Sequence, residues 1–252
     1  MNAIYDTVDV AGRNLRTLVR TPQALVFAAV QPVIFVLLFR YVFGGAIHVT
    51  GVNYVDYLMP GIFAQAVAFG AIGTAVGLSA DLKSGLLVRF RTLPMARIAV
   101  LGGRTLADLA RNLLVVIVMV GVGFAVGFRT SHGAAALVAA LGLVVLFAYA
   151  LSWLFAALGL RFSEPEAAQA AAVPIMFLLV FTSSAFVPAG SMPGWLQAIG
   201  SHQPVNALIT AERDLLLGGP AAHDVLVSVA WSVGILIVFA ALAARGYARM
   251  GR

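Results

Sequence analysis

The chain contains no cysteine and few charged residues. The absence of Cys from all 252 residues excludes disulfides, thiolate chemistry and cysteine-based metal sites. Only 10% of the residues are Asp, Glu, Lys or Arg, whereas about a quarter are charged in an ordinary soluble domain. Hydrophobic residues make up 62% of the chain, and the mean hydropathy is +0.99. This composition predicts a polytopic membrane protein.

The signature motifs of ATP-binding and hydrolytic proteins are also absent. The one lysine, Lys83, is not preceded by the glycines of a GxxxxGK[ST] phosphate-binding loop, so the chain cannot bind ATP by that route. There is no GxSxG nucleophile elbow and no HExxH zinc motif, and the four His residues are scattered. The sequence therefore predicts no catalytic residue, no metal site and no cofactor bound by this chain.

Charge-free windows predict an all-α protein with six membrane-spanning helices, because a helix that crosses the hydrocarbon needs about 20 apolar residues. The fifth window is too long for one helix, and a cluster of prolines and glycines from Pro188 onward ends a span near residue 187. The predicted spans cover residues 21–43, 57–80, 110–128, 134–160, 167–187 and 225–244. Residues 1–252 then form a single transmembrane domain.

The positive residues are unevenly distributed between the two sides of these predicted spans. If the N-terminus is cytoplasmic, thirteen of the sixteen Lys and Arg residues fall in inner segments, and the outer segments hold only Arg40, Arg129 and Arg213. The preference for Arg over Lys is typical of a GC-rich bacterium. We therefore predict a multi-pass protein of the bacterial plasma membrane with both termini cytoplasmic. The net charge of +6 then indicates contact with membrane lipids rather than with nucleic acid.

Residues 3–20 precede the first span and carry apolar side chains at helical spacing. Ile4, Val8, Ala11 and Leu15 recur on one face, and most charged residues lie elsewhere on the helical wheel. This pattern predicts an amphipathic helix in the inner membrane interface. A short basic tail that only anchors the first span is the alternative.

Residues 81–104 connect the second and third spans on the predicted cytoplasmic side. The segment is basic, compatible with a helix and longer than a turn. Phe90 and its neighbouring leucines would have no use in a loop that is needed only for its charge. We therefore predict a cytoplasmic helix that another protein contacts, and a basic stop-transfer loop is the alternative.

A few uncharged polar residues interrupt the predicted spans. We assign to a substrate pathway Gln31, Pro32, Gln65, Thr182, Ser183 and Ser184. The two glutamines need partners at depth, and a hydrogen bond between helices explains them as well as a wet cavity does. All ten acids fall at predicted helix ends or in loops, which argues against an ion-coupled secondary transporter.

Residues 188–220 form the predicted outer segment between the fifth and sixth spans. Prolines break it into short pieces, and Trp195 suits a membrane interface. The spacing of Leu208, Ala211 and Leu215 puts them on one face of a helix, with Glu212 near the other face. We predict two short amphipathic helices that lie on or dip into the outer leaflet, because the apolar content argues against an ordinary exposed loop.

Four stretches of the sequence carry a resemblance to a known family. They are RTPQALVFAAVQPVIFVLLFRYVFGG (20–45), residues 53–112 with RFRTLPMARIAVLGGRTLADLARN at their end, EPEAAQAAA (164–172) and SSAFVPAGSMPGWLQAIGSHQPVNALITAERDLLLGG (183–219). With the order of predicted elements, they resemble the ABC-2 type permeases of ATP-driven exporters, and more closely the daunorubicin/doxorubicin-resistance permease subfamily. The resemblance implies a permease dimer, formed with a second copy or a paralogue. It also implies a separate cytoplasmic ABC ATPase subunit that binds ATP and Mg.

The resemblance further implies roles for two segments. Coupling to the ATPase falls on Asp81, Gly85, Leu86, Leu87, Arg89, Phe90, Arg91, Leu93 and Pro94. There the apolar side chains would dock in a groove of the ATPase and the arginines would add complementary charge. Relatives often have an acid where Val88 stands, so a salt bridge to the ATPase is not expected at that position. An outer gate falls on Pro188, Pro193, Trp195, Pro204 and Arg213.

These observations predict the membrane-spanning subunit of an ABC exporter, without an ATPase site of its own. The exported compound would be hydrophobic or amphipathic, because an apolar pathway with few polar anchors suits drugs, lipids and lipid-linked glycans alike. The alternatives are an integral-membrane lipid-modifying enzyme, which lacks support from clustered polar groups, and an ion-coupled secondary transporter.

Overall fold

The computed structural model describes residues 7, 10–12, 22–47, 49, 51–86 and 97–249. These residues are helical apart from short connections, and no strand occurs among them, which confirms the all-helical prediction for that part of the chain. The elements are α2 (Pro22–Leu37), the π-helix η1 (Leu38–Phe43), α3 (Tyr54–Lys83), α5 (Arg97–Ala125), α6 (Gly133–Gly159), α7 (Pro165–Phe181), the 3-10 helix η2 (Ala189–Ser191), α8 (Gly194–Ser201), α9 (Pro204–Leu217) and α10 (Ala221–Arg249).

Four of these helices are long and apolar enough to cross a membrane, namely α3, α5 from Ala99, α6 and α10. Two shorter apolar helices, Ala28–Phe43 and Pro165–Phe181, accompany them. The prediction of a multi-pass membrane protein is therefore confirmed. That the two shorter helices also cross, which would complete six spans, stays a prediction, as do the orientation and the placement of α8 and α9 at the outer leaflet.

Two helix boundaries differ from the predicted ones. Helix α5 begins at Arg97 rather than near residue 110, so part of the predicted coupling segment 81–104 belongs to this helix. Arg104, Asp108 and Arg111 are accommodated within this helix because they pair with one another or with α3, as described below. Helix α7 ends at Phe181 rather than at residue 187, and residues 182–187 form a turn and a connection.

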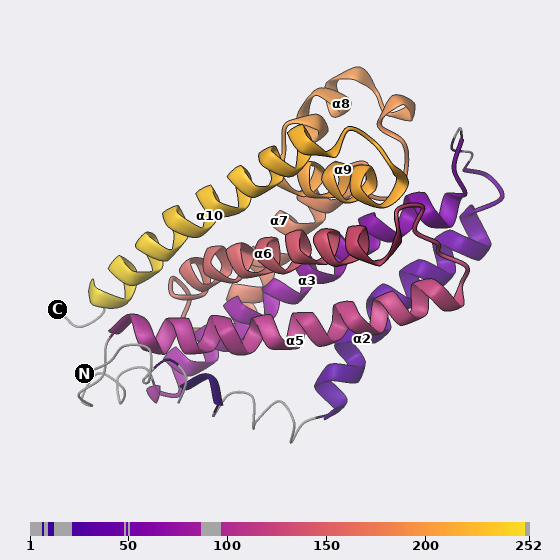
Figure 1. The fold of residues 1–252 in the computed structure, drawn as a ribbon. Coiled ribbons are helices and arrows are strands. Elements are labelled where there is room, and N and C mark those ends of the chain that lie inside the picture. The colour runs from indigo at the N-terminus through magenta and orange to yellow at the C-terminus, as the bar shows by residue number, and fades with distance from the viewer. Residues whose placement is uncertain are drawn as a thin grey trace.

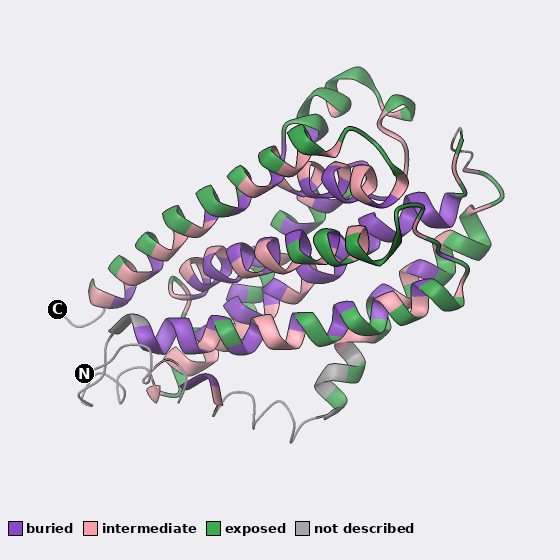
Figure 2. Cartoon of the chain, viewed as in Figure 1, coloured by how far each residue is buried: buried purple, intermediate pink, exposed green. Residues whose placement is uncertain are grey.

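Helix α3 runs through the middle of the bundle (Figure 1), where it contacts α2, α5, α6, α7 and α9. Within its apolar window 72% of the residues are buried, against 17% for α10, which packs mainly on α6 and α9. Figure 2 shows the same contrast, since α3 is mostly buried along the half that begins at Tyr54 and α10 exposes one long face. The bundle is therefore organised around α3.

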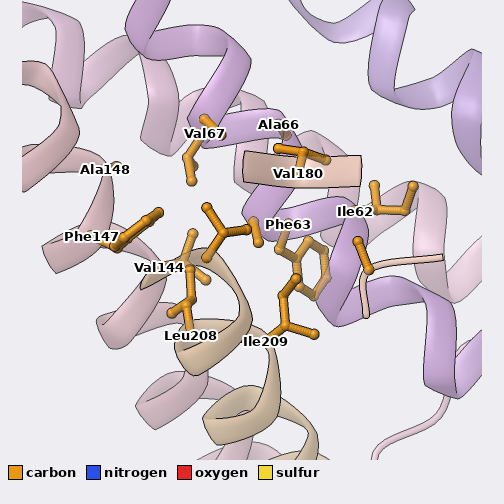
Figure 3. Packing of buried hydrophobic residues seen from close by; sticks show 14 of the residues in the cluster. Ile62, Phe63, Ala66, Val67, Val144, Phe147, Ala148, Val180, Leu208 and Ile209 are labelled. Carbon is orange, nitrogen blue, oxygen red and sulfur yellow. The ribbon is translucent and has the colours of Figure 1, made fainter. Parts of the chain in front are cut away.

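The centre of the packing lies where four helices meet on the half of α3 that begins at Tyr54 (Figure 3). Ile62, Phe63 and Val67 of α3 face α6, α7 and α9 with at most 1% of their surface exposed. Leu208 and Ile209 of α9 are fully buried in the same cluster. Because burial of such a side chain contributes about 1.5–3 kcal/mol, α9 is an integral part of the bundle.

Large apolar side chains remain exposed on the outside of α5 and α10. Ile117 of α5 is 55% exposed, and Ile237 and Leu226 of α10 are 64% and 70% exposed. An apolar face of this extent needs lipid or another apolar surface against it. This distribution fits a helix bundle whose solvent is the bilayer.

Only a small part of the predicted interfacial helix 3–20 falls within the described residues. Thr7 and residues 10–12 are helical. The side chains of Val10 and Ala11 are buried. A Cβ added at Gly103 would lie 2.6 Å from the Val10 side chain, so this helix packs closely on α5. The rest of residues 3–20 lies outside the description, and the interfacial location stays a prediction.

Gly159→Ala should destabilise the bundle, because a Cβ there would lie 2.5 Å from the Ala75 carbonyl oxygen of α3. Backbone cannot move aside as a flexible side chain can, so we expect a loss of about 1–3 kcal/mol. Thermal unfolding of the purified protein in detergent measures it. Gly142→Ala on the same helix is the matched control, since nothing lies within 4 Å of its Cβ position. Equal midpoints for the two variants would contradict the close contact of α3 and α6.

Candidate functional site

A cavity of about 620 Å³ lies between α2, α3, α5 and α7. Its walls are mostly apolar, with Phe69 of α3 and Phe177 of α7 among them, and the two rings meet edge to face at 5.2 Å between centroids. The polar residues that line it are Gln31, Gln65, Arg111, Asn112 and Gln169. An apolar cavity with a few convergent polar groups is the usual form of a small-molecule site.

Half of the predicted pathway residues surround this cavity. Gln31, Pro32 and Gln65 line it. Thr182, Ser183 and Ser184 do not, because they follow α7 near its C-terminus. The hydroxyl of Thr182 donates to the Leu178 carbonyl at 2.7 Å, and that of Ser183 donates to the Val180 carbonyl. The structure thus separates the predicted set into two groups, and a pathway role stays a prediction for both.

Three polar residues of the cavity lining, Gln169, Arg111 and Asn112, were not assigned to the pathway from the sequence. Gln169 carries the same signal as Gln31, a polar residue in an apolar window, and that signal could have found it. Arg111 and Asn112 stood at the predicted edge of the third span. Because α5 begins at Arg97, they lie well inside the helix and reach the cavity.

The amides at the inner wall of the cavity are buried and unpartnered. Gln65 is 1% exposed, and neither its Nε2 nor its Oε1 has a hydrogen-bond partner among the described residues. The Nδ2 of Asn112 is likewise buried and unpartnered there. A buried amide without a partner costs about 1–3 kcal/mol. Facing a cavity, such groups are available to hydrogen-bond a polar group that enters it.

A chain of charges joins α3 and α5 on the side of the cavity toward Lys83. Arg104 of α5 pairs with Asp81 of α3 at 2.8 Å. Asp108 lies within 3.6 Å of both Arg104 and Arg111. Arg111 donates to the Gly70 carbonyl of α3 at 2.6 Å and also lines the cavity. Side chains of one connected network therefore extend from Asp81 to the cavity wall.

The glycines of α3 make room for these arginines. A Cβ at Gly77 would lie 1.5 Å from an Arg104 guanidinium nitrogen, and one at Gly73 would lie 2.7 Å from an Arg111 nitrogen. A Gly-xxx-Gly pattern commonly lets two helix backbones approach closely. Here it accommodates guanidinium groups on the surface of α3.

The predicted coupling residues fall mostly outside the described part of the chain. Leu87, Arg89, Phe90, Arg91, Leu93 and Pro94 lie in the undescribed segment 87–96. Of the others, Asp81 pairs with Arg104, Gly85 follows the C-cap of α3 with a φ of +72°, and Leu86 is half-buried. Coupling stays a prediction for the whole set.

A second contact fastens this end of α3 to the start of α7. Lys83 and Glu164 form an ion pair, and the Ser79 hydroxyl donates to the Phe162 carbonyl at 2.8 Å. Pro165 occupies the first turn of α7, with Glu166 beside it. Both fit the start of a helix, where Pro needs no donor and an acid faces the positive end of the dipole.

Arg213 of α9 joins three segments at the opposite end of the bundle. Its Nε donates to the Tyr57 carbonyl of α3 at 3.0 Å, and its terminal nitrogens donate to the Ser184 hydroxyl at 2.9 Å and the Ser184 carbonyl at 2.7 Å. Its guanidinium carbon lies 3.5 Å from the centroid of the Tyr57 ring. Burial lowers the pKa of Arg213 to about 10, so the group stays charged at neutral pH. Asn206 completes this outer cluster by accepting from the Ser184 amide at 2.9 Å.

The other predicted gate residues take no part in this cluster. Pro188 and Pro193 directly precede η2 and α8, and Pro204 is the first residue of α9. Trp195 is 68% exposed on α8. The prolines therefore divide the segment between α7 and α10 into short helices, as predicted, while Arg213 carries its polar contacts. A gating role stays a prediction for all five.

Two predictions about acidic residues are wrong. Glu212 does not lie on the outer face of α9 but is fully buried, because α9 is surrounded by α3, α6 and α10. Burial raises its pKa well above the usual value. Asp108 is also buried inside a helix, so the acids are not confined to helix ends and loops. No group of three or more His, Cys, Asp or Glu that could hold a metal occurs in the described part of the chain.

Comparison with known proteins gives one consistent result. The profile of the ABC-2 type transporter family matches residues 9–217. The daunorubicin resistance ABC transporter permease protein DrrB1 of Streptomyces coeruleorubidus is 36% identical over 226 residues, covering 90% of this chain and 80% of the relative. The doxorubicin resistance ABC transporter permease protein DrrC of Mycobacterium tuberculosis is 30% identical over 223 residues, covering 88% and 80%.

Arg213→Lys should destabilise the outer cluster although it keeps the charge. Lysine cannot donate in the fixed fork that reaches Tyr57 and Ser184 together, so buried acceptors would lose their donors. We expect a loss of about 1–3 kcal/mol in thermal unfolding. Arg40→Lys is the matched control, because the Arg40 side chain is exposed and makes no hydrogen bond to the described residues. Equal unfolding midpoints for the two variants would show that the Arg213 hydrogen bonds do not stabilise the packing of α9 on α3.

Proposed function

The chain belongs to the ABC-2 type transporter family, and we propose that it is the permease subunit of an ATP-driven exporter of a hydrophobic or amphipathic compound. The family makes it a transport subunit without an ATPase site of its own. One observation carries the proposal about its cargo. Between α2, α3, α5 and α7, an apolar cavity holds buried amides that have no partner among the described residues.

The cavity fits a compound of drug or lipid-like character. Its volume of about 620 Å³ falls within the range of about 300–1,000 Å³ that is usual for such ligands. Phe69 and Phe177 offer apolar contact, and Gln65 and Asn112 offer hydrogen bonds. The relatives named for daunorubicin and doxorubicin resistance support a drug as cargo.

The energy would come from a separate cytoplasmic ABC ATPase, because the sequence lacks a phosphate-binding loop. We assign the contact to residues 81–94, which follow the apolar part of α3. The network from Asp81 through Arg104 and Asp108 to Arg111 begins at this segment and ends in the cavity wall. It provides a physical connection between an ATPase docked there and the cargo.

A second permease copy or a paralogue would complete the pathway. The exposed apolar faces of α2, α5, α7 and α10 cannot all contact water, and lipid or a second permease would cover them. The ion-coupled alternative has gained two buried acids inside helices, Glu212 and Asp108. Glu212 lies in α9 rather than in one of the four long apolar helices, and Asp108 of α5 is paired with Arg104 and Arg111. Export that stops on ATP depletion and survives collapse of the proton gradient supports the ABC exporter over this alternative.

Gln65→Leu should weaken the response to cargo without harming the fold. The substitution keeps the side-chain volume and removes a buried amide that lacks a partner, so thermal stability should stay equal or rise. Loss of one hydrogen bond to the cargo should raise the concentration that half-stimulates ATP hydrolysis by roughly tenfold. The measurement uses the reconstituted complex and a panel of drugs and lipids.

Gln197→Leu, on the exposed helix α8, is the matched control for this experiment. It should change neither the stimulation curve nor the unfolding midpoint. An unchanged curve for Gln65→Leu, with every compound that stimulates the parent, would contradict the assignment of this cavity to the cargo.

Phe90→Asp should abolish co-purification of the ATPase subunit while membrane insertion stays intact. A carboxylate cannot replace an aromatic ring in an apolar groove, because it would be desolvated without a partner. Phe90→Leu is the control and should retain most of the binding. Pull-down of the ATPase from detergent-solubilised membranes measures both variants. Undiminished recovery with Phe90→Asp would refute the coupling assignment.

A further inference from the structure

A second cavity, of about 640 Å³, lies between the middle of α7 and the ends of α6 and α10 nearest Arg249. One part of its lining is apolar and consists of Leu154 and Leu158 of α6, Ile175 of α7, and Phe239 and Leu242 of α10. The other part consists of three exposed arginines, Arg161, Arg245 and Arg249. We refer to this cavity as the arginine slot.

The arginines of the slot have no anionic partner within the described part of the chain. None of the three makes an ion pair or a side-chain hydrogen bond there, whereas Arg104, Arg111, Arg129 and Arg213 all do. Glu164, three residues after Arg161, is engaged by Lys83. Three guanidinium groups therefore line one cavity, and no described residue accepts from their donors.

The slot is polar at one end and apolar at the other. Arg245 and Arg249 lie one turn apart on the same face of α10. Phe239 lies ten residues before Arg249 on that helix, which is about 15 Å along its axis. The arginines sit at the end of the bundle where Lys83 meets Glu164, and the apolar lining extends from them toward the middle of α10.

We propose that the arginine slot binds one anionic phospholipid. The phosphate accepts hydrogen bonds from Arg161, Arg245 and Arg249, and one acyl chain lies along Leu158, Ile175 and Phe239. Guanidinium groups match phosphate oxygens in a bidentate fork, and basic pockets between membrane helices are a known form of lipid head-group site. A zwitterionic lipid fits less well, because its ammonium group meets the arginines with like charge.

The occupant has a structural consequence for α10. This helix is the least buried of the four long helices, and one side of the slot is its own surface. A lipid held there joins α10 to α6 and α7 through its phosphate and its chain. The protein should therefore be more stable with the anionic lipid than without it. This expectation does not depend on the cargo or on the ATPase.

The test compares anionic phosphatidylglycerol with zwitterionic phosphatidylcholine of the same acyl chains. The purified full-length permease is placed in nanodiscs of each lipid, retained lipid is counted by native mass spectrometry, and thermal unfolding is recorded. The parent should retain one phosphatidylglycerol and unfold at a higher temperature in that lipid. The double variant Arg245→Gln/Arg249→Gln should not retain phosphatidylglycerol, because its apparent affinity for this lipid should fall at least tenfold. Its unfolding midpoint should then be the same in the two lipids.

Two further variants keep the test decisive. Arg40→Gln removes an exposed arginine from the other end of the bundle and should leave lipid retention unchanged. Leu242→Trp fills the apolar part of the slot from an exposed position while all the arginines remain, and it should expel the lipid. This variant answers the question even if the double arginine variant fails to fold.

Three outcomes would overturn the proposal. The first is equal retention by the parent and by the variants of the slot. The second is an equal loss with Arg40→Gln, which would indicate a general effect of charge. The third is a double arginine variant that keeps its lipid but loses the ATPase subunit, which would make this surface a protein contact instead.

Discussion

Arginines of the neighbouring helices contact the polar groups of α3 at three positions along the middle of the bundle. A carboxylate in an apolar setting is costly unless it is paired, and a backbone carbonyl can accept a second hydrogen bond beside that of its own helix. Arg213 donates to the Tyr57 carbonyl at one end, Arg111 to the Gly70 carbonyl further along, and Arg104 pairs with Asp81 at the other end. Between the first two contacts stands Gln65, whose amide has no partner among the described residues and faces the cavity. Arg111, one of the arginines that contact α3, therefore also borders the space where a ligand can replace the missing partner.

The positions of several helices followed directly from the sequence, because an uncharged apolar window has few alternatives to a helix in a membrane. The ends of α6 lie within a residue of the predicted 134–160, and α2 with η1 covers residues 22–43 against a predicted 21–43. The start of α5 did not follow. Reading the sequence by charge-free windows places the end of a span at each charged residue. In the structure Asp108 pairs with Arg104 and Arg111 within α5, and the two arginines contact α3. Glu212 was misplaced for a related reason, since helical spacing cannot show that α9 is packed on more than one face.

The cavity could be predicted in part. Gln31 and Gln65 were identifiable because an amide in an apolar span requires a partner, and Gln169 carries the same information. Arg111 and Asn112 could not be found this way, since their position depends on a contact with Gly70 that is distant in sequence. The hydroxyls after α7 do not line this cavity. The hydroxyls of Thr182 and Ser183 donate to backbone carbonyls of α7. The amino-acid composition does not reveal such local hydrogen bonds.

The contact between Lys83 and Glu164 also has a practical consequence. Lys83 is the only lysine in the chain, so reagents that acylate ε-amines address a single side chain here. Its partner joins the end of α3 to the beginning of α7. The rate of acylation at this one position thus reports how often the two helices separate there, and the protein carries its own probe of motion at the end where an ATPase would act.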